Sequence, residues 1–280
     1  MKAVEMQIGD LRLDEFYKTY WRRKPYVAKG GATSISYEDL TFDDFLGVCD
    51  RLENTELPLV KRYKNGTVHA QNLDRACPIL EAVTQRFAAV WPIQHLWFDG
   101  AYSLSGGGIG SHYDVSDNFI LQQTGSKAWR LHPPDFISDR EKRDRFLGIV
   151  PDATMYMPDG AIEIRLDPGD LLYIPILWVH EGTALSESFS LTLAFNYDLP
   201  LTQMTKQIGR LLTGRKLFWE PLFAPPVGNE PTNRQLELDE AIDCYLDRLV
   251  ETLAEPAFQR DLKRLCRKVF YDQLLSERRL

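Results

Sequence analysis

The hydrophobic and polar positions divide this chain into three zones. Between about residues 10 and 92, apolar runs at helical spacing are mixed with short runs next to turn residues, which indicates both helices and strands. Between about 93 and 199, short apolar or alternating runs follow one another closely, which is typical of antiparallel strands. From 201 to 280 the apolar residues return at helical spacing. The pattern predicts a β-rich centre with helical elements on both sides.

Capping and turn residues locate the elements of the first zone. Phe16 and Tyr20 belong to a short predicted helix that ends at Pro25, because proline cannot continue a helix. The segment from Thr41 to Asp44 has the form of a capping box and predicts a helix through Leu52.

A hairpin and a further helix complete this zone. Asn65-Gly66, inside the segment from Leu59 to Ala70, is a strong hairpin signal because both residues accept the left-handed backbone of a tight turn. Pro78 to Val90 predicts a helix with proline at its start.

The central zone contains runs suited to buried strands. Asn118 to Gln123 and Lys127 to Leu131 flank the turn Thr124-Gly125-Ser126, which predicts a hairpin. So many strands within about a hundred residues favour a barrel or a sandwich over a doubly wound sheet. Further strands are expected at Ala161 to Leu166, Leu171 to Val179 and Ser190 to Tyr197.

The last zone predicts two long helices, from Leu238 to Leu253 and from Phe258 to Leu275. Residues 218–232, rich in proline and glycine, are the expected irregular connection before them. Two long helices after a barrel need a surface to cover, which is either a domain of their own or a partner subunit.

Composition and charge narrow the class of protein. With 280 residues, 44% of them hydrophobic, the chain can bury a full core. The net charge of -7 does not favour broad nucleic-acid binding. Neither a membrane span nor a signal peptide is expected, because the apolar stretches are too short. The four cysteines are scattered without a CxxC pair, so disulfides or a zinc site are not expected and a reducing cytoplasm fits best.

Three residues suggest a metal site. In a strand, residues i and i+2 point to the same face, so His112 and Asp114 can aim at one point. His180, after a Pro-Gly-Asp turn and an apolar strand, would add a second imidazole from a neighbouring strand. Two histidines and a carboxylate on one side of a metal leave open positions opposite, as in non-haem Fe(II) oxygenases. A histidine in a strand is more often a hydrogen-bonded core residue, so these residues alone leave both alternatives open.

Several motifs together resemble the JmjC-type, cupin-fold 2-oxoglutarate oxygenases. Within that family the chain most resembles bacterial ribosomal oxygenases, which hydroxylate a side chain of a ribosomal protein, and next the asparaginyl hydroxylases. The motifs are Gly106 to His112 with Asp114, Asn118 to Leu131, Pro168 to His180 followed by Glu181-Gly182, and Phe16 to Pro25.

The resemblance implies a mainly β fold with flanking helices. A double-stranded β-helix (jelly-roll) core is expected at residues 93–200. N-terminal α/β elements at 1–92 are expected to pack on it, and a C-terminal helical region at 201–280 is expected to form a homodimer.

The resemblance also assigns site residues. His112, Asp114 and His180 stand at the positions of the iron ligands, and Lys127 stands where the family binds the distal carboxylate of 2-oxoglutarate. A buried ammonium needs an anionic partner, which the co-substrate would supply. The alternative is that Lys127 caps an exposed turn. Asn118 matches a polar site residue of the asparaginyl hydroxylases, although a structural amide explains it nearly as well.

Weaker candidates complete the expected site. Ser103 and Asn196 are polar residues near strand ends and are candidates for contact with the co-substrate. Tyr113 and Ser116 flank the first ligands and are candidates for contact with substrate. Trp178 joins them because it is two residues from the second histidine and would share its strand face, although a buried aromatic residue is the commoner explanation.

One position departs from the family pattern. Ile109 stands where some relatives place a hydroxyl residue that helps to bind the co-substrate, so the carboxylate needs another donor. His69, His95 and His132 have no partners at metal-ligand spacing and are expected to be structural or exposed.

The implied reaction couples hydroxylation of an unactivated C–H bond to oxidative decarboxylation of 2-oxoglutarate, with Fe(II) and O2, and releases succinate and CO2. The expected substrate is a side chain of a protein or peptide. The alternatives are the same chemistry on a free amino acid or natural-product small molecule, and a non-catalytic metal-binding cupin. Neither a membrane nor a nucleic acid is an expected partner.

Overall fold

The computed structural model describes residues 7–34, 40–55, 59–90, 95–146, 155–196, 200–215 and 234–276. The chain forms two compact units, Met1–Tyr197 and Asp198–Leu280. Among the described helices, none combines the length and the apolar character that crossing a membrane requires.

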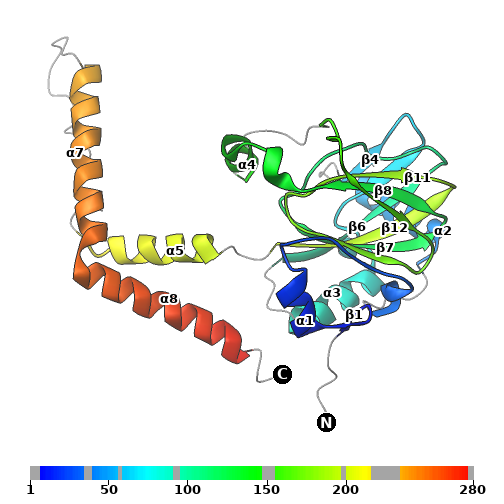
Figure 1. Cartoon of the computed structure of the whole chain (residues 1–280), viewed down its shortest axis with the longest axis horizontal. Helices are drawn as coiled ribbons and strands as arrows, with labels where there is room; N and C mark the ends of the chain where they lie inside the picture. The colour runs from blue at the N-terminus through cyan, green and yellow to red at the C-terminus, as the bar shows by residue number, and fades with distance from the viewer. Residues whose placement is uncertain are drawn as a thin grey trace. The chain divides into compact units, whose positions relative to one another are not determined.

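Two antiparallel sheets build the first unit (Figure 1). The larger has the strand order β3-β10-β7-β12-β6-β5-β4 and the smaller has the order β11-β8-β9. All neighbouring strands in them are antiparallel, which confirms the expected barrel or sandwich. The larger sheet consists of β3 (Tyr26–Ala28), β4 (Val60–Arg62), β5 (Thr67–Ala70), β6 (His95–Ser103), β7 (Asp117–Thr124), β10 (Leu171–Ile174) and β12 (Ser188–Asn196). The smaller consists of β8 (Lys127–His132), β9 (Ile162–Leu166) and β11 (Val179–Ala184), and β1 (Gln7–Ile8) and β2 (Leu11–Arg12) form a separate pair.

The three helices predicted in the first zone are present, although α1 ends at Thr19 and not at Pro25. Thr41 caps α2 with a capping box: its hydroxyl accepts the N–H of Asp44, and the Asp44 carboxylate accepts the N–H of Thr41. The sequence pattern does not predict α4, because that helix is almost entirely charged and has no apolar stripe. The helices are α1 (Leu13–Thr19), α2 (Phe42–Glu53), α3 (Pro78–Val90) and α4 (Asp139–Phe146), with short 3-10 turns η1 (Gly31–Ser34), η2 (Leu73–Arg75) and η3 (Pro134–Phe136).

Alternate residues of the larger sheet face two different surroundings. In β7, Phe119 and Leu121 join the core that contains residues of α1, α2 and α3. Ile120, between them, packs toward the smaller sheet with Trp129 and Leu131 of β8. The smaller sheet has only three strands, about 4.8 Å apart, and cannot cover all seven strands of the larger one. It packs on the β10–β7 side, and a cavity lies over β6, β5 and β4.

The expected hairpin between residues 118–123 and 127–131 is wrong. These segments do form β7 and β8, but β7 pairs with β10 and β12, whereas β8 pairs with β9 and β11. The turn at Gly125 carries the chain from one sheet to the other. The turn needs glycine, since its φ is 62° and a Cβ there would lie 2.0 Å from the carbonyl oxygen of Glu187.

The single strand expected from Leu171 to Val179 is also wrong. β10 ends at Ile174, and β11 begins at Val179 in the other sheet. Pro175 explains the break, because proline has no N–H to give to a sheet. The strands expected at 161–166 and 190–197 are confirmed as β9 and β12.

Three described helices form the second unit: α5 (Pro200–Leu212), α7 (Arg234–Ala254) and α8 (Pro256–Ser276). Both long helices predicted from the sequence are confirmed as α7 and α8, and α8 contacts both α5 and α7. The irregular connection expected at 218–232 lies outside the described residues.

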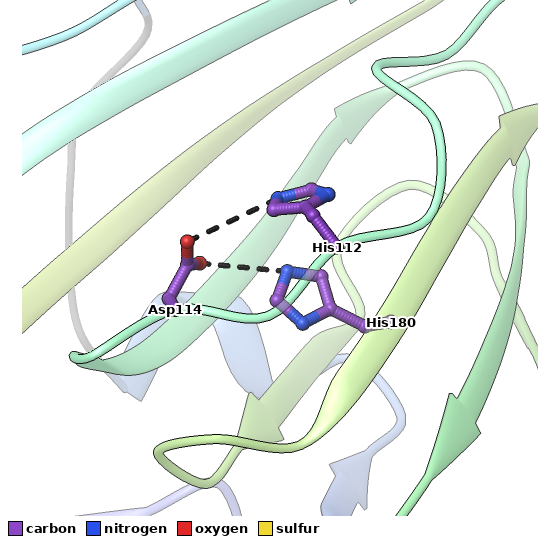
Figure 2. Close-up of side chains that lie close together, drawn as sticks. All are labelled: His112, Asp114 and His180. Carbon is purple, nitrogen blue, oxygen red and sulfur yellow. Dashed lines mark ion pairs between the residues drawn. The ribbon is translucent and has the colours of Figure 1, made fainter. Parts of the chain in front are cut away.

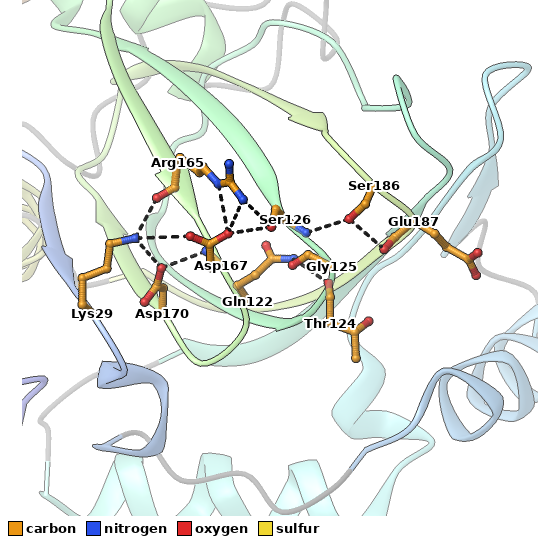
Figure 3. Close-up of polar contacts among 10 residues, drawn as sticks. All are labelled: Lys29, Gln122, Thr124, Gly125, Ser126, Arg165, Asp167, Asp170, Ser186 and Glu187. Carbon is orange, nitrogen blue, oxygen red and sulfur yellow. Dashed lines mark hydrogen bonds and ion pairs between the residues drawn. The ribbon is translucent and has the colours of Figure 1, made fainter.

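A polar network ties the N-terminal segment to the turn before β10 (Figure 3). The Asp170 carboxylate accepts the N–H of Gly30 at 3.0 Å, the N–H of Asp167 at 2.8 Å and the ammonium of Lys29 at 2.6 Å. Lys29 also donates to the carbonyl oxygen of Arg165 at 3.0 Å. Burial alone would raise the pKa of Asp170, but these hydrogen bonds hold it below its ordinary value.

We expect Asp170→Asn to lower the free energy of unfolding at pH 7 by about 1–3 kcal/mol, because the variant loses the charge that strengthens two backbone hydrogen bonds. The folded-state pKa lies below the unfolded value of about 3.9. The stabilisation that the Asp170 charge provides is therefore fully present above the unfolded-state pKa of about 3.9 and is lost as the pH falls through the folded-state pKa. Urea denaturation at pH 7 and at acidic pH measures the difference. Asp14→Asn, at an exposed ion pair with Arg12, is the control and should change nothing measurable. If the difference in unfolding free energy between the wild type and Asp170→Asn were as large at acidic pH as at pH 7, the prediction would be contradicted.

Candidate metal centre and its cavity

A cavity of about 530 Å³ lies between the two sheets. Inward-facing residues of β7, β12, β6, β5 and β4 line one side, and residues of β8 and β11 line the other. The inward-facing residues of β12 that reach it, Ser190 and Thr192, are short and polar. The cavity therefore exists because small side chains occupy a face that the smaller sheet covers incompletely.

His112, Asp114 and His180 come together on this cavity (Figure 2). Their ligand atoms all lie within 4.8 Å of one another. Nε2 of His180 is 3.4 Å from Oδ2 of Asp114, and Nε2 of His112 is 4.0 Å from Oδ1. In the part of the chain that the structure describes, no other group of three histidine, cysteine or acidic residues is arranged to hold a metal ion.

Backbone carbonyls orient both imidazoles. Nδ1 of His112 is 2.8 Å from the carbonyl oxygen of Gly110, and Nδ1 of His180 is 2.8 Å from that of Trp178. A carbonyl oxygen only accepts hydrogen bonds, so Nδ1 of each ring carries a proton. In the neutral form of each ring the lone pair is therefore on Nε2, the nitrogen that can bind a metal.

The main chain brings the ligand segments together. The N–H of His112 donates to the carbonyl oxygen of His180 at 3.0 Å, and the N–H of His180 donates back at 2.8 Å. Leu177, with a φ of 67°, turns the chain ahead of β11 and donates its N–H to the carbonyl oxygen of Asp114 at 2.9 Å. Three backbone hydrogen bonds thus connect the segments that carry the three side chains.

The surroundings keep the carboxylate of Asp114 ionised. Burial alone would raise its pKa, but the hydrogen bond with His180 and the nearby imidazoles hold it well below its ordinary value. The amide of Asn118 also donates to Oδ2 of Asp114 at 2.7 Å, and the hydroxyl of Ser116 donates to the amide oxygen at 3.1 Å. Burial lowers the pKa of His112. Burial would do the same to His180, but the hydrogen bond with Asp114 raises its pKa instead.

A second buried carboxylate anchors the same segment. Asp117 accepts hydrogen bonds from Nε of Arg22 at 3.0 Å, the hydroxyl of Tyr173 at 2.7 Å and the N–H of Ile176 at 3.3 Å. The N–H of Arg22 donates to the Tyr173 hydroxyl at 2.9 Å, and the left-handed backbone of Arg22 (φ 54°) permits both contacts. The turn after α1 is therefore tied to the start of β7, three residues from Asp114.

Lys127 places a buried ammonium on the cavity. Its side chain is 3% exposed, and burial lowers its pKa to about 8. Nζ lies 3.5 Å from the hydroxyl of Ser190 and 5.6 Å from the centre of the Trp129 ring. Among the described residues, no carboxylate forms an ion pair with it. The indole N–H of Trp129 is likewise buried without a hydrogen-bond partner in that part of the chain. This wall suits an anionic group that accepts hydrogen bonds.

The residues expected to contact substrate are split between cavity and core. Ser116 lines the cavity. Tyr113 packs in a cluster with Ile137 and Met157, and Trp178 packs in the core with Trp129, so neither lines the cavity. Trp178 does not share a strand face with the second histidine, because it lies in the turn before β11.

The weaker co-substrate candidates are not seen at the cavity. Ser103 is buried at the end of β6, where its hydroxyl accepts a hydrogen bond from Thr67 at 3.1 Å. Asn196 ends β12, and its side chain is outside the part of the chain that the structure describes. Ile109, the departure from the family pattern, does line the cavity and offers no hydroxyl there.

The cavity also contains residues that sequence reasoning missed. His69 on β5, expected to be structural or exposed, lines it together with Asp99 of β6. Arg145 reaches it from α4. Alternation along a strand puts such residues on one face, but only the pairing of β4, β5 and β6 turns that face toward the metal ligands. His132 does not line the cavity, and the side chain of His95 lies outside the described ones.

Comparison with known proteins finds similar sequences and structures. Residues 80–202 match the model of the JmjC domain, and this stretch includes the three clustered side chains and Lys127. The structure of YcfD, a ribosomal oxygenase from Escherichia coli, in complex with cobalt and 2-oxoglutarate is similar, with a TM-score of 0.55 and 20% identity. The match covers 92% of this chain and 71% of that one. The fold is therefore the double-stranded β-helix that was expected.

Two curated proteins are similar in sequence. The probable ribosomal oxygenase of Haemophilus influenzae is 27% identical over 209 residues, covering 66% of this chain and 49% of that protein. The ribosomal protein uL16 3-hydroxylase of Escherichia coli is 33% identical over 105 residues, covering 38% of this chain and 26% of that protein. The chain thus spans about half the length of the first relative and about a quarter of the second.

Proposed function

We propose that this chain, whose residues 80–202 form a JmjC domain, is an Fe(II)- and 2-oxoglutarate-dependent dioxygenase that hydroxylates an unactivated C–H bond of a protein or peptide side chain. One observation carries the proposal: His112, Asp114 and His180 converge on the same cavity as the buried ammonium of Lys127. The first three suit a metal ion, and the fourth suits a carboxylate of the co-substrate.

The donor set fits Fe(II). Two imidazole Nε2 atoms and one ionised carboxylate are the ligand set that non-haem iron oxygenases use in a facial arrangement. The Nδ1–H bonds of both rings to backbone carbonyls hold the nitrogens in place, as outer hydrogen bonds do at other metal sites. Iron and 2-oxoglutarate, when bound, supply the redox chemistry that activates dioxygen.

The surroundings of Lys127 fit 2-oxoglutarate. A buried ammonium with one long contact to the Ser190 hydroxyl gains an ion pair when a carboxylate enters. The remaining tasks of the protein are to orient the target carbon and to exclude water. No described acidic residue besides Asp114 lies in the metal cluster, and the proposed chemistry needs no side-chain general base there.

A protein or peptide substrate is supported by the relatives. One of them is named a hydroxylase of the ribosomal protein uL16 and another a probable ribosomal oxygenase. We also propose a cytoplasmic location, because Cys49, Cys77, Cys244 and Cys266 are all free thiols, as a reducing compartment keeps them.

We expect His112→Ala to lose metal and turnover together, because the variant retains only two of the three ligand side chains. The Kd for Co(II) should rise more than roughly a hundredfold, beyond what loss of an outer hydrogen bond costs. Co(II) titration and succinate release from 2-oxoglutarate measure the two effects. His132→Ala, outside the cavity, is the matched control and should keep both properties. Succinate release by His112→Ala at the wild-type rate would show that the metal assignment is wrong.

We expect Lys127→Met to weaken 2-oxoglutarate binding without affecting the metal. Removing one partner of a buried charge pair costs about 2–5 kcal/mol. The Kd for 2-oxoglutarate, measured by calorimetry with Co(II) bound, should therefore rise at least about thirtyfold. Lys64→Met, at an exposed lysine away from the cavity, is the control. Unchanged 2-oxoglutarate affinity in Lys127→Met would place the co-substrate elsewhere.

We further propose that residues 201–280 form a homodimer interface. On α7, Ile242, Leu246 and Val250 are spaced by four residues and lie on one helix face. Their exposed fractions are 37%, 49% and 65%. A continuous stripe of aliphatic side chains is rarely left this exposed to water, so we propose that a second copy of the chain covers it.

Light scattering should find a dimer of the wild-type chain and a monomer of Leu246→Lys, because the lysine would place a charge in the apolar contact. Glu251→Lys, at an exposed position of α7 outside the stripe, should leave the dimer intact. A wild-type monomer at the concentrations used for activity would refute the interface.

A further inference from the structure

One part of the cavity is used by neither the metal ligands nor Lys127. It lies over β6, β5 and β4, where the smaller sheet does not cover the larger one. Residues that line it include Lys61, Tyr63, His69, Trp97 and Asp99. With a metal held by His112, Asp114 and His180 and the co-substrate held by Lys127, as proposed above, this is the part of the cavity left for a substrate side chain.

Asp99 is a carboxylate on that wall without a cationic partner. Oδ1 accepts the N–H of Asn72 at 2.9 Å, and Oδ2 accepts the indole N–H of Trp97 at 3.1 Å. Both donors are neutral, and no lysine, arginine or histidine among the described residues forms an ion pair with Asp99. Burial raises the pKa of Asp99 to about 7, and the nearby negative charges of Asp114 and Asp74 act in the same direction. In the ionised form each oxygen can accept a further hydrogen bond, so a substrate N–H that donates to it favours that form.

His69 adds a second polar group with unused capacity. It lies on β5, opposite Ala101 of β6, and burial lowers its pKa to about 4. Its ring is therefore neutral at pH 7 and offers one acceptor and one donor. No hydrogen bond to it is present within the described residues, whereas most buried ring nitrogens have one.

We propose that Asp99, assisted by His69, determines substrate specificity by accepting hydrogen bonds from a side chain that ends in N–H groups. This inference rests on the proposed function. A guanidinium, ammonium, imidazole or amide would satisfy the free acceptor positions of Asp99. Asp99 would repel a substrate side chain that ends in a carboxylate. An aliphatic side chain would leave the carboxylate of Asp99 without a hydrogen-bond donor. A site built to hydrogen-bond an N–H group rejects both kinds of analogue.

The chain offers a matched control for the competing explanation that Asp99 only supports the backbone. Asp74 also uses its carboxylate to join η2 to β6, since it accepts the N–H of Phe98 at 2.9 Å. Asp74 does not line the cavity. Asp74→Asn therefore perturbs a comparable backbone contact without replacing a residue of the cavity wall. Because the charge of Asp74 raises the pKa of Asp99, its removal favours the ionised form of Asp99, the form that accepts hydrogen bonds.

The test uses the full chain with Zn(II) and 2-oxoglutarate and blocked pentapeptides Gly-Gly-Xaa-Gly-Gly, where Xaa is Arg, Lys, His, Gln, Glu or Leu. Dissociation constants come from saturation-transfer NMR titrations. We expect the four N–H-bearing peptides to bind roughly tenfold or more tightly than the Glu and Leu peptides. That ratio should fall about tenfold in Asp99→Asn and persist in Asp74→Asn. If Asp99→Asn does not fold, Asp99→Ser, whose short hydroxyl can still accept from the backbone, replaces it.

The inference is overturned if the wild type shows no preference, if Asp99→Asn keeps it, or if both variants lose it equally. Succinate release with Fe(II) is measured separately on the wild type. No succinate together with an intact, Asp99-dependent preference would count against the dioxygenase and still support Asp99 as the recognition residue.

Discussion

The main-chain pairing of His112 with His180 is the constraint on which the site depends. His112 lies in the connection between β6 and β7, and His180 lies in β11, far away in the sequence, yet two backbone hydrogen bonds hold them side by side. In each case the imidazole then donates to the carbonyl two residues earlier in the chain, Gly110 or Trp178. The orientation of both ligands therefore comes from the backbone. Side chains are needed only to position Asp114, and Asn118 does so.

The cavity follows from the unequal width of the two sheets. Where three strands face seven, the apolar side chains of β7, β8 and β10 fill the space and make it dry. Farther along the larger sheet the same inward face carries Ser190, Thr192 and Asp99, which line the cavity. A single alternation of side chains thus gives the larger sheet an apolar stretch that packs against the smaller sheet and a polar stretch that lines the cavity.

Local patterns predicted much of this molecule. The capping box at Thr41, the proline at the start of α3 and the apolar spacing of α7 depend only on nearby residues, so they could be predicted. The convergence of His112, Asp114 and His180 could be predicted because the spacing of the first two, the apolar strand before the third and a family resemblance all favoured it. The separation of β7 and β8 into different sheets could not be predicted, since Gly125 is also typical of a hairpin turn. Asp99 and His69 escaped notice because their shared face is set by long-range strand pairing.

The position of β12 has a consequence for biosynthesis. It is the last strand of the first unit, yet it lies between β7 and β6 and pairs with both. While the chain is being made, β6 and β7 emerge early and must wait, with open edges, for the strand that joins them. Open edges of this kind invite pairing with other chains. The larger sheet can therefore be completed only after residue 196 has left the ribosome, and this late pairing of strands that are distant in the sequence favours slow folding.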